Sequence, residues 1–286
     1  MDERTLIAPE RAAALLAAGA ARAIDVRYDP VGPSCDPKRG ARDFAASHLP
    51  GAVYASLDDD LADLSVRGRG RHPLPSEAAF TETLSRFGLT PDDAIIVYDD
   101  GNGAIASRLW WMLRLVGHAR VAVLDGGFAA WKSSGLPLET NARAYPRTHY
   151  DARYDAAAIE TSAGVVRKLA DGAIALVDAR AANRYRGENE TIDPVAGHVP
   201  GALNRPFAEN LDATGRFKSP QALRDEWRRV IGDRDPRDVV VMCGSGVTAC
   251  HDLLALEHAG LAGARVYAGS WSEWISDPSR PIATGA

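Results

Sequence analysis

Short apolar runs alternate along the chain with stretches whose apolar residues recur every three or four positions. Buried strands are predicted at residues 95–98, 121–124, 174–177, 239–242 and 265–267. Amphipathic helices are predicted between them, at residues 78–86, 105–116, 221–230 and 248–258. Helices that separate strands are typical of parallel β-α-β units, so we predict an α/β fold of parallel sheets flanked by helices.

The pattern also repeats on a larger scale. Three motifs occur twice in the same order, 143–153 residues apart: His-x-Pro-Gly-Ala at 48–52 and 198–202, Asp-x-Arg at 25–27 and 178–180, and a Gly and a Trp five positions apart at 126–131 and 269–274. Three ordered matches indicate a duplicated globular domain of roughly 130 residues. The period is much too long for a solenoid.

The boundary between the two copies is predicted after residue 138. Residues 139–155 contain Pro146 and no sustained apolar period, which favours a linker that runs over the surface. A helical pattern at residues 157–169 begins the second copy. We therefore expect a first domain at residues 1–138, a linker at 139–156 and a second domain at 157–286.

The composition narrows the function classes. The 286 residues are 46% hydrophobic and 25% charged, which is typical of a globular protein and excludes wholesale disorder. The net charge of −5 and the lack of a basic cluster argue against nucleic acid as a partner. No run of 18 apolar residues and no secretory leader pattern is present, so we expect neither a membrane partner nor export, and a cytoplasmic location. Three cysteines are too few for a disulfide framework.

A candidate chemical site follows the strand predicted at residues 239–242. A loop with two glycines, Gly244 and Gly246, separates this strand from a helix predicted to begin near Thr248. The glycines allow a tight bend that turns several N–H groups toward one centre, and the helix N-terminus adds a partial positive charge. Such an arrangement stabilises an anion. We therefore expect Cys243, at the start of the loop, to be a thiolate near neutral pH and a nucleophile.

The first copy contains the same loop without the thiol. At an offset of 143 residues both loop glycines have counterparts, Gly101 and Gly103, and Asp100 takes the place of Cys243. The fold therefore does not require a cysteine at this position. The comparison favours a specific chemical role for Cys243 over a purely structural one.

Residues 243–248 have the sequence Cys-Gly-Ser-Gly-Val-Thr. Together with the two His-x-Pro-Gly-Ala motifs and the repeated Gly and Trp, this loop resembles the active-site loop of the tandem-domain rhodanese sulfurtransferases, particularly their 3-mercaptopyruvate branch. The thiosulfate branch typically has Arg-Lys where this chain has Gly244 and Ser245. The resemblance covers nearly the whole chain and implies two rhodanese-like domains, with the catalytic cysteine in the second alone.

The resemblance implies a sulfurtransferase without a metal or organic cofactor. Cys243 would take sulfur from a small anionic donor, 3-mercaptopyruvate or thiosulfate, as a persulfide, and pass it to a thiol, thioredoxin or cyanide. Loop N–H groups and the hydroxyls of Ser245 and Thr248 would stabilise the anionic sulfur. The candidate donor-binding residues are Arg184 and the loop residues Gly244, Ser245, Gly246, Val247 and Thr248.

Only some of the arginines and histidines of the family pattern have counterparts in this chain. Arg184 matches the family's first substrate arginine. The second arginine that usually follows is absent from residues 190–194, with Arg186 as an alternative. The resemblance links His48 to the active site, although the matching places of His48 and His198 favour a shared structural role. Cys250, on the following helix, is predicted to be a core residue.

Two other functions compete with sulfur transfer: a different enzyme activity, and a binding role with little turnover. A cysteine phosphatase or arsenate reductase would need an arginine six positions after Cys243, but Ala249 stands there. A sulfur-carrier or binding module with little turnover would need no active loop, which the second copy retains. Thiosulfate sulfurtransferase proper stays open as the alternative within the family.

Overall fold

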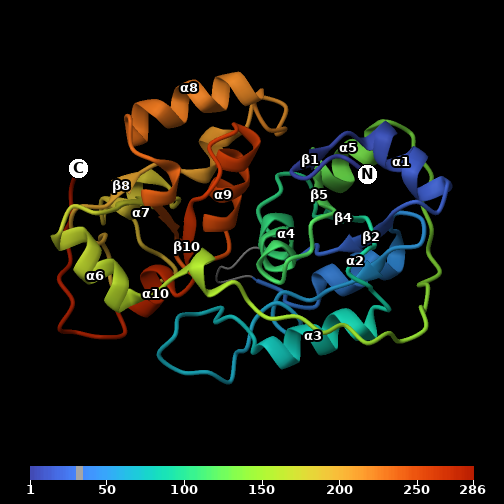
Figure 1. Cartoon of the computed structure of the whole chain (residues 1–286), viewed down its shortest axis with the longest axis horizontal. Coiled ribbons are helices and arrows are strands. Elements are labelled where there is room, and N and C mark those ends of the chain that lie inside the picture. Colours follow the sequence, from blue (N-terminus) through green and yellow to red (C-terminus); the bar gives the residue numbers. More distant parts are fainter. Residues whose placement is uncertain (30–34) are drawn as a thin grey trace. The chain divides into compact units, whose positions relative to one another are not determined.

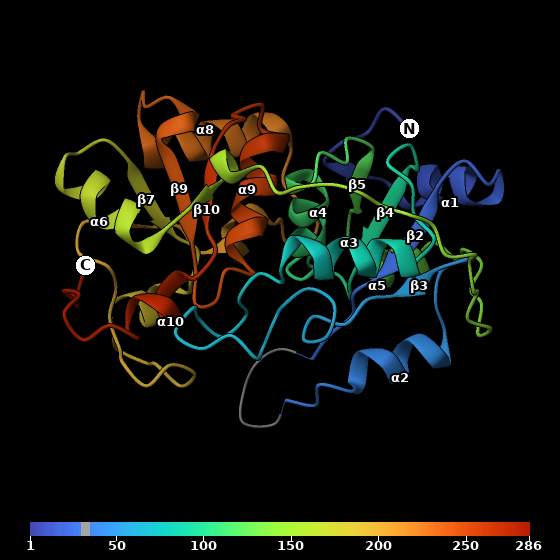
Figure 2. The same cartoon turned by 60° about the horizontal axis from the view of Figure 1, so that its bottom comes forward.

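Residues 1–29 and 35–286 are described by the computed structural model, and they divide into two units (Figures 1 and 2). Unit 1 consists of Met1–Asp63, Leu74–Asp155 and Ala213–Arg216. Unit 2 consists of Leu64–Pro73, Ala156–Asp212 and Phe217–Ala286. The division does not follow the chain in one step, because Leu64–Pro73, from the first half of the sequence, belong to unit 2.

Each unit contains a five-stranded parallel sheet in the described residues, and the strand order is the same in both. In unit 1 the order is β1-β5-β4-β2-β3, formed by β1 (Leu6–Ile7), β2 (Arg22–Asp25), β3 (Val53–Tyr54), β4 (Ile95–Tyr98) and β5 (Val121–Leu124). In unit 2 it is β6-β10-β9-β7-β8, formed by β6 (Ile159–Glu160), β7 (Ala175–Asp178), β8 (Leu203–Asn204), β9 (Val239–Met242) and β10 (Arg265–Tyr267). The sequence repeat is therefore a repeat of topology.

Helices connect the strands and cover the sheets. Those of unit 1 are α1 (Pro9–Ala17), α2 (Arg39–Ala46), α3 (Glu77–Arg86), α4 (Ala106–Leu115) and α5 (Gly127–Ser133). Those of unit 2 are α6 (Ser162–Ala170), α7 (Ala182–Tyr185), α8 (Pro220–Ile231), α9 (Ala249–His258) and α10 (Ser270–Trp274), with short 3₁₀ turns at Ala156–Ala158, Phe207–Asn210 and Pro236–Asp238. In unit 2, α8 packs beside α9, and α6 beside α10 (Figure 1).

The predicted α/β fold with parallel sheets is confirmed, and most predicted elements lie within two residues of their observed positions. The strands at 95–98, 121–124, 239–242 and 265–267 are observed as predicted. The helix predicted at 157–169 is corrected, because a 3₁₀ turn and the two-residue strand β6 precede α6. Thr161 ends that stretch as the N-cap of α6, and its side chain accepts a hydrogen bond from the Gly164 N–H.

The repeated motifs make the same buried contacts in each unit. Asp25 pairs with Arg27 at 2.7 Å, and Asp178 pairs with Arg180 at 2.6 Å. The indole N–H of Trp131 donates to the Pro137 carbonyl, and that of Trp274 donates to the Pro281 carbonyl. These motifs therefore stabilise the fold, which explains why they occur in both copies.

The two repeated histidines also have matching structural environments. His48 Nδ1 lies 2.8 Å from the Phe44 carbonyl oxygen and its ring stacks on that of Phe44. His198 Nδ1 lies 2.8 Å from the Tyr185 carbonyl oxygen and its ring stacks on that of Tyr185. Both rings are buried, and the equivalence accounts for their recurrence.

Candidate active site

Cys243 lies at the carboxyl end of β9, a central strand of the unit 2 sheet, where residues 243–248 (the Cys243 loop) lead into α9. The thiol is almost fully buried. The Cys243 N–H donates to the Ser270 hydroxyl at 3.1 Å, and the Cys243 carbonyl accepts from the Trp271 N–H at 2.9 Å. Ser270 adopts a φ of 53°, which a serine rarely does, and such strain is characteristic of functional sites.

The two glycines of the Cys243 loop differ in what lies next to them: backbone beside Gly246, and the end of a flexible side chain beside Gly244. Gly246 has a φ of 77°, and a Cβ there would lie 2.1 Å from the Ala268 carbonyl oxygen. A Cβ on Gly244 would lie 2.9 Å from Nη2 of Arg71. With no side chains in the way, the Gly246 N–H donates to the Cys243 sulfur at 3.1 Å. The loop thus directs a backbone donor at the thiol.

The matching loop of unit 1 shows what this backbone binds. Both carboxylate oxygens of Asp99 accept hydrogen bonds at 3.0–3.1 Å from four backbone N–H groups, those of Gly101, Gly103, Ile105 and Ala106. Gly103 has the same φ of 77° as Gly246. One loop conformation therefore gathers N–H donors around a buried anion, which in unit 1 is the protein's own carboxylate.

Unit 2 has Cys243 in place of that carboxylate. Tyr98 and Met242 pair with the aspartates of the two Asp-x-Arg motifs, and the next residues, Asp99 and Cys243, accept through their carbonyls from the equivalent N–H groups of Phe128 and Trp271. The sequence-based match of Asp100 to Cys243 is corrected, because the unit 1 loop has one residue more. In the described part of the chain, the N–H groups of Gly244, Thr248 and Ala249 have no hydrogen-bond acceptor. Donors that bind Asp99 in unit 1 therefore remain available beside the Cys243 sulfur.

A histidine that the sequence did not single out contacts this loop. His72 Nδ1 lies 2.9 Å from the Ser245 hydroxyl oxygen, and both side chains are buried. His72 comes from residues 64–73 (the Arg71 segment), which belong to unit 2. No motif marks it, because it stands 173 positions before Ser245 in the sequence. The ring of His48 packs on Phe44 within unit 1, an environment that matches that of His198 on Tyr185.

The Arg71 segment is fixed to the loop by its backbone as well. The Arg71 N–H donates to the Ser272 hydroxyl at 3.0 Å, and the Ser272 N–H donates to the Gly244 carbonyl at 2.9 Å. Two consecutive residues of this segment, Arg71 and His72, therefore contact two consecutive residues of the Cys243 loop.

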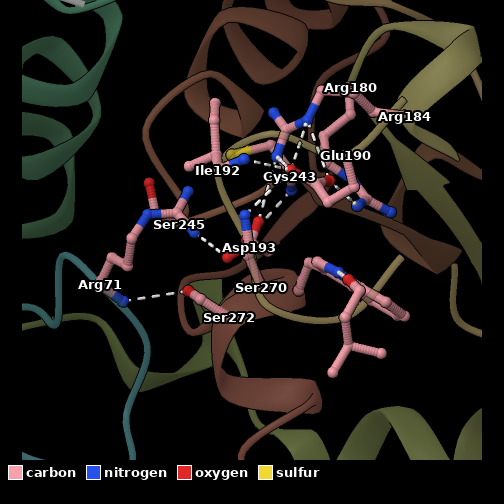
Figure 3. A network of polar contacts seen from close by, with 12 residues as sticks. Arg71, Arg180, Arg184, Glu190, Ile192, Asp193, Cys243, Ser245, Ser270 and Ser272 are labelled. Atoms are coloured by element: carbon pink, nitrogen blue, oxygen red, sulfur yellow. Dashed lines mark hydrogen bonds and ion pairs between the residues drawn. The ribbon is translucent and has the colours of Figure 1, made fainter. Parts of the chain in front are cut away.

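Alternating arginines and carboxylates form a network beside the thiol (Figure 3). The Asp193 carboxylate lies between two guanidinium groups, bonded to Arg71 through Oδ1 and to Arg184 through Oδ2 at 3.1 Å. Glu190 binds Arg184 at 2.9 Å and lies 3.5 Å from Arg180. The network joins α7, the loop that follows it and the Arg71 segment.

The two carboxylates of the network differ in their pKa shifts. Burial raises the pKa of Asp193 above its ordinary value, and the neighbouring Glu190 adds to this shift while Arg71 and Arg184 oppose it. Burial also disfavours the charged form of Glu190, but hydrogen bonds from Arg184 and from the Asp193 and Ile192 N–H groups outweigh it, so its pKa is lowered. Glu190 is therefore firmly ionised, whereas Asp193 is the carboxylate more readily protonated.

Arg184, the donor-binding arginine expected from the sequence, lies in this network. Its Nε and Nη2 atoms donate to Glu190, and Nη2 also donates to Asp193. The edge of the guanidinium that would bind a carboxylate in two-point fashion is thus bonded inside the protein. Arg186 pairs with exposed Glu188 instead.

The remaining loop and helix residues support the thiol. Thr248 is the N-cap residue of α9 and its side chain makes no capping bond, while Val247 is buried. Cys250 is fully buried and its thiol donates to the Gly246 carbonyl at 3.3 Å. Within residues 1–29 and 35–286, no cluster of three or more histidine, cysteine or acidic side chains could bind a metal ion.

Comparison with protein-family models identifies the two copies. The model of the rhodanese-like domain matches residues 8–134 and again residues 161–277. The chain belongs to the rhodanese family and is a sulfurtransferase. The sequence-based resemblance is thereby confirmed, and Cys243 lies in the second rhodanese-like domain.

Individual rhodanese relatives agree with this assignment. The chain is 46% identical over 252 residues to a probable 3-mercaptopyruvate sulfurtransferase of Pseudomonas aeruginosa, covering 87% of this chain and 89% of the relative. It is 39% identical over 285 residues to SseB of Mycobacterium tuberculosis, a putative thiosulfate sulfurtransferase, covering 98% and 96%. The crystal structure of the 3-mercaptopyruvate sulfurtransferase SseA of Escherichia coli superposes with a TM-score of 0.82 at 31% identity, covering 94% of this chain and all of that one.

Among the described residues, no helix of this rhodanese is long and apolar enough to cross a membrane.

Proposed function

We propose that the protein moves a sulfane sulfur from 3-mercaptopyruvate to an acceptor through a persulfide on Cys243. One observation supports this most directly. The backbone donors that bind the Asp99 carboxylate in unit 1 have their counterparts in unit 2 beside a cysteine sulfur, because Cys243 takes the place of Asp99. A persulfide anion on Cys243 would receive these hydrogen bonds.

The proposed first step balances without a cofactor. The Cys243 thiolate attacks the donor sulfur, the new S–S bond forms, and the C–S bond of 3-mercaptopyruvate breaks. The electron pair of that bond passes to the donor's C3 carbon, which takes up the proton from the donor thiol to give pyruvate. In the second step an acceptor thiol, reduced thioredoxin or cyanide removes the outer sulfur and regenerates the Cys243 thiolate.

The loop residues have separate proposed roles. Gly244, Gly246, Val247 and Thr248 supply backbone N–H groups, and the hydroxyl of Thr248 adds a donor. The Ser245 hydroxyl, positioned by His72 at 2.9 Å, is placed to bind the donor carbonyl or to pass a proton to the leaving carbon. Arg184 adds positive charge to the polar network beside the thiol.

The loop composition supports 3-mercaptopyruvate over thiosulfate. Gly244 and Ser245 place no cation on the loop, whereas thiosulfate, a dianion, gains most from charges close to the transferred sulfur. Thiosulfate remains the second candidate because SseB, a relative that covers nearly the whole chain, is named for it.

The proposal is tested by following sulfur onto one cysteine. After treatment with 3-mercaptopyruvate, mass spectrometry should find one additional sulfur, about 32 Da, on a peptide that contains Cys243. Cys243→Ser should abolish this addition and all turnover while leaving the fold intact, and Cys250→Ser serves as the matched control. Labelling of Cys35 or Cys250 would refute the assignment, and a higher kcat/KM for thiosulfate would reverse the donor preference.

A further inference from the structure

Arg71 is the arginine of the polar network whose guanidinium is least used inside the protein. Its Nη1 bonds to Asp193. In the part of the chain that the structure describes, neither its Nε nor its Nη2 has a hydrogen-bond acceptor, and Nε is buried. A buried N–H group without a partner is costly, and a ligand that accepts a hydrogen bond from it would remove that cost.

The other two arginines of the network differ in this respect. Arg180 donates through Nε and Nη2 to Asp178, and Arg184 donates through the same two atoms to Glu190. The Nε–Nη2 edge is the one that binds a carboxylate in two parallel hydrogen bonds. Arg71 alone among these three arginines presents that edge without an internal acceptor.

The position of this edge relates it to the thiol. Nη2 of Arg71 lies so close to Gly244 that a Cβ on the glycine would be 2.9 Å from it. Gly244 directly follows Cys243, and its N–H is among the loop donors without an acceptor in the described residues. Figure 3 shows Arg71 directed toward Asp193 beside the labelled Cys243 and Ser245. The free edge and the sulfur-binding donors therefore border the same space.

We propose that Arg71 is the donor-binding arginine of this enzyme, and that its Nε–Nη2 edge binds the carboxylate of the sulfur donor in two-point fashion. The proposal rests on the sulfur transfer proposed for Cys243 and names the residue that recognises the donor's anionic end. It also accounts for the absence of a second arginine from residues 190–194, because the Arg71 segment supplies a cation from elsewhere in the sequence.

Asp193 acts on Arg71 as a positioning residue. It holds Nη1 and thereby orients the opposite edge of the guanidinium. Its carboxylate also bonds to Arg184, so one negative charge lies between the two guanidinium groups before the donor binds. The guanidinium of Arg71 is then already ordered, so little conformational entropy is lost when the donor carboxylate binds to it.

The test compares three variants of the full chain. Arg71→Gln should raise KM for 3-mercaptopyruvate about 10- to 100-fold, the loss expected for a charge-assisted double hydrogen bond, while kcat changes less than about threefold. Arg71→Lys keeps the charge beside Asp193 but lacks the two-point edge, so it should recover only part of the loss. Arg69→Gln is the matched control, because Arg69 lies on the same segment with its side chain 67% exposed.

A second readout does not depend on turnover. Pyruvate contains the donor's carboxylate without its sulfur, and it should protect Cys243 from alkylation by iodoacetamide in the parent enzyme. Protection by pyruvate should need at least about tenfold more pyruvate in Arg71→Gln and be unchanged in Arg69→Gln.

The outcomes separate the two proposals. If Cys243 gains no sulfur in the parent enzyme, the proposed function fails, whereas loss of pyruvate protection in Arg71→Gln would still support the binding role. Equal KM and equal pyruvate protection in parent and Arg71→Gln would overturn the role of Arg71. Full recovery by Arg71→Lys would also overturn it, since charge next to Asp193 would then suffice.

Discussion

Asp99 and Cys243 show how one side chain changes what a loop can bind. Each directly follows a central strand, at matching positions before a loop with two glycines. The Asp99 carboxylate accepts hydrogen bonds from four backbone N–H groups, whereas the Cys243 sulfur accepts one from Gly246. A carboxylate at this position therefore binds the loop donors itself, whereas a thiol leaves donors for a further anionic atom.

Cys243→Asp should accordingly fill the second loop as Asp99 fills the first. Both Cys243→Asp and Cys243→Ser lose persulfide formation, but we expect the new carboxylate to bind the loop N–H donors and to make Cys243→Asp at least as stable as Cys243→Ser. Urea unfolding measures the difference. A Cys243→Asp protein that is clearly less stable than Cys243→Ser would contradict the role of the backbone donors.

Asp252, on α9 behind the loop, predicts a pH dependence of stability. Burial raises its pKa well above the ordinary value, and neither the hydrogen bond from Asn210, at 2.7 Å, nor the nearby Arg205 compensates. Asp178 and Glu209 add to the shift, and His251 faces the same asparagine. The folded state thus retains a proton that the unfolded state releases near pH 4.

The unfolding free energy should therefore fall as pH rises from about 4 toward the raised pKa of Asp252. Asp252→Asn keeps an acceptor for Asn210 and should flatten that slope and stabilise the protein at neutral pH. Urea unfolding between pH 4 and pH 8 measures both effects. A slope that is the same in the two proteins would show that Asp252 is not its source.

At the scale of elements, the sequence predicted best what is long and buried. The central strands β4 and β9 are four residues long and buried throughout, so their apolar runs are unambiguous. The edge strands β1, β3, β6 and β8 have two residues each, too few to show a period. Of the site, the Cys243 loop could be proposed from its own residues, because a strand, a glycine turn and a helix start form a local signal, whereas Arg184 could be proposed only through the resemblance to the rhodanese family.

The Asp99 loop is an element whose stability depends on its internal anion. Asp99→Ala should destabilise the protein by about 2–4 kcal/mol, because several buried N–H groups lose their charged acceptor at once. Asp100→Ala is the control, since Asp100 is exposed and its nearest cation, Arg39, is 3.7 Å away. Urea unfolding measures both. Equal unfolding free energies for the two variants would contradict the structural role of the Asp99 carboxylate.

For the whole molecule, the division of the chain explains why His72 and Arg71 escaped prediction. They follow β3 in the first half of the sequence, yet residues 64–73 belong to unit 2 and contact Ser245, Asp193 and Ser272. Contacts between residues more than a hundred positions apart leave no local pattern. A repeat-based division at residue 138 gives no reason to assign a piece of the first copy to the second unit.

Residues 156–286 produced alone should therefore be poor in donor use, because they lack both Arg71 and His72. We expect a KM for 3-mercaptopyruvate more than about tenfold above that of the full chain, measured in steady-state assays. Adding residues 1–155 as a separate chain should restore the KM. Residues 1–155 that carry Arg71→Gln and His72→Gln should not restore the KM. Full activity of residues 156–286 alone would contradict the expectation.

The close approach of Arg71 to Gly244 has a consequence for engineering. Position 244 can accept a bulky cation only if position 71 gives up its own, because the two side chains would compete for one space. Redesign of the loop toward a dianionic donor must then change both positions together, and Gly244→Arg should be tolerated better with Arg71→Gly than without it. Positions 71 and 244 should therefore be changed together, although 172 residues lie between them in the chain.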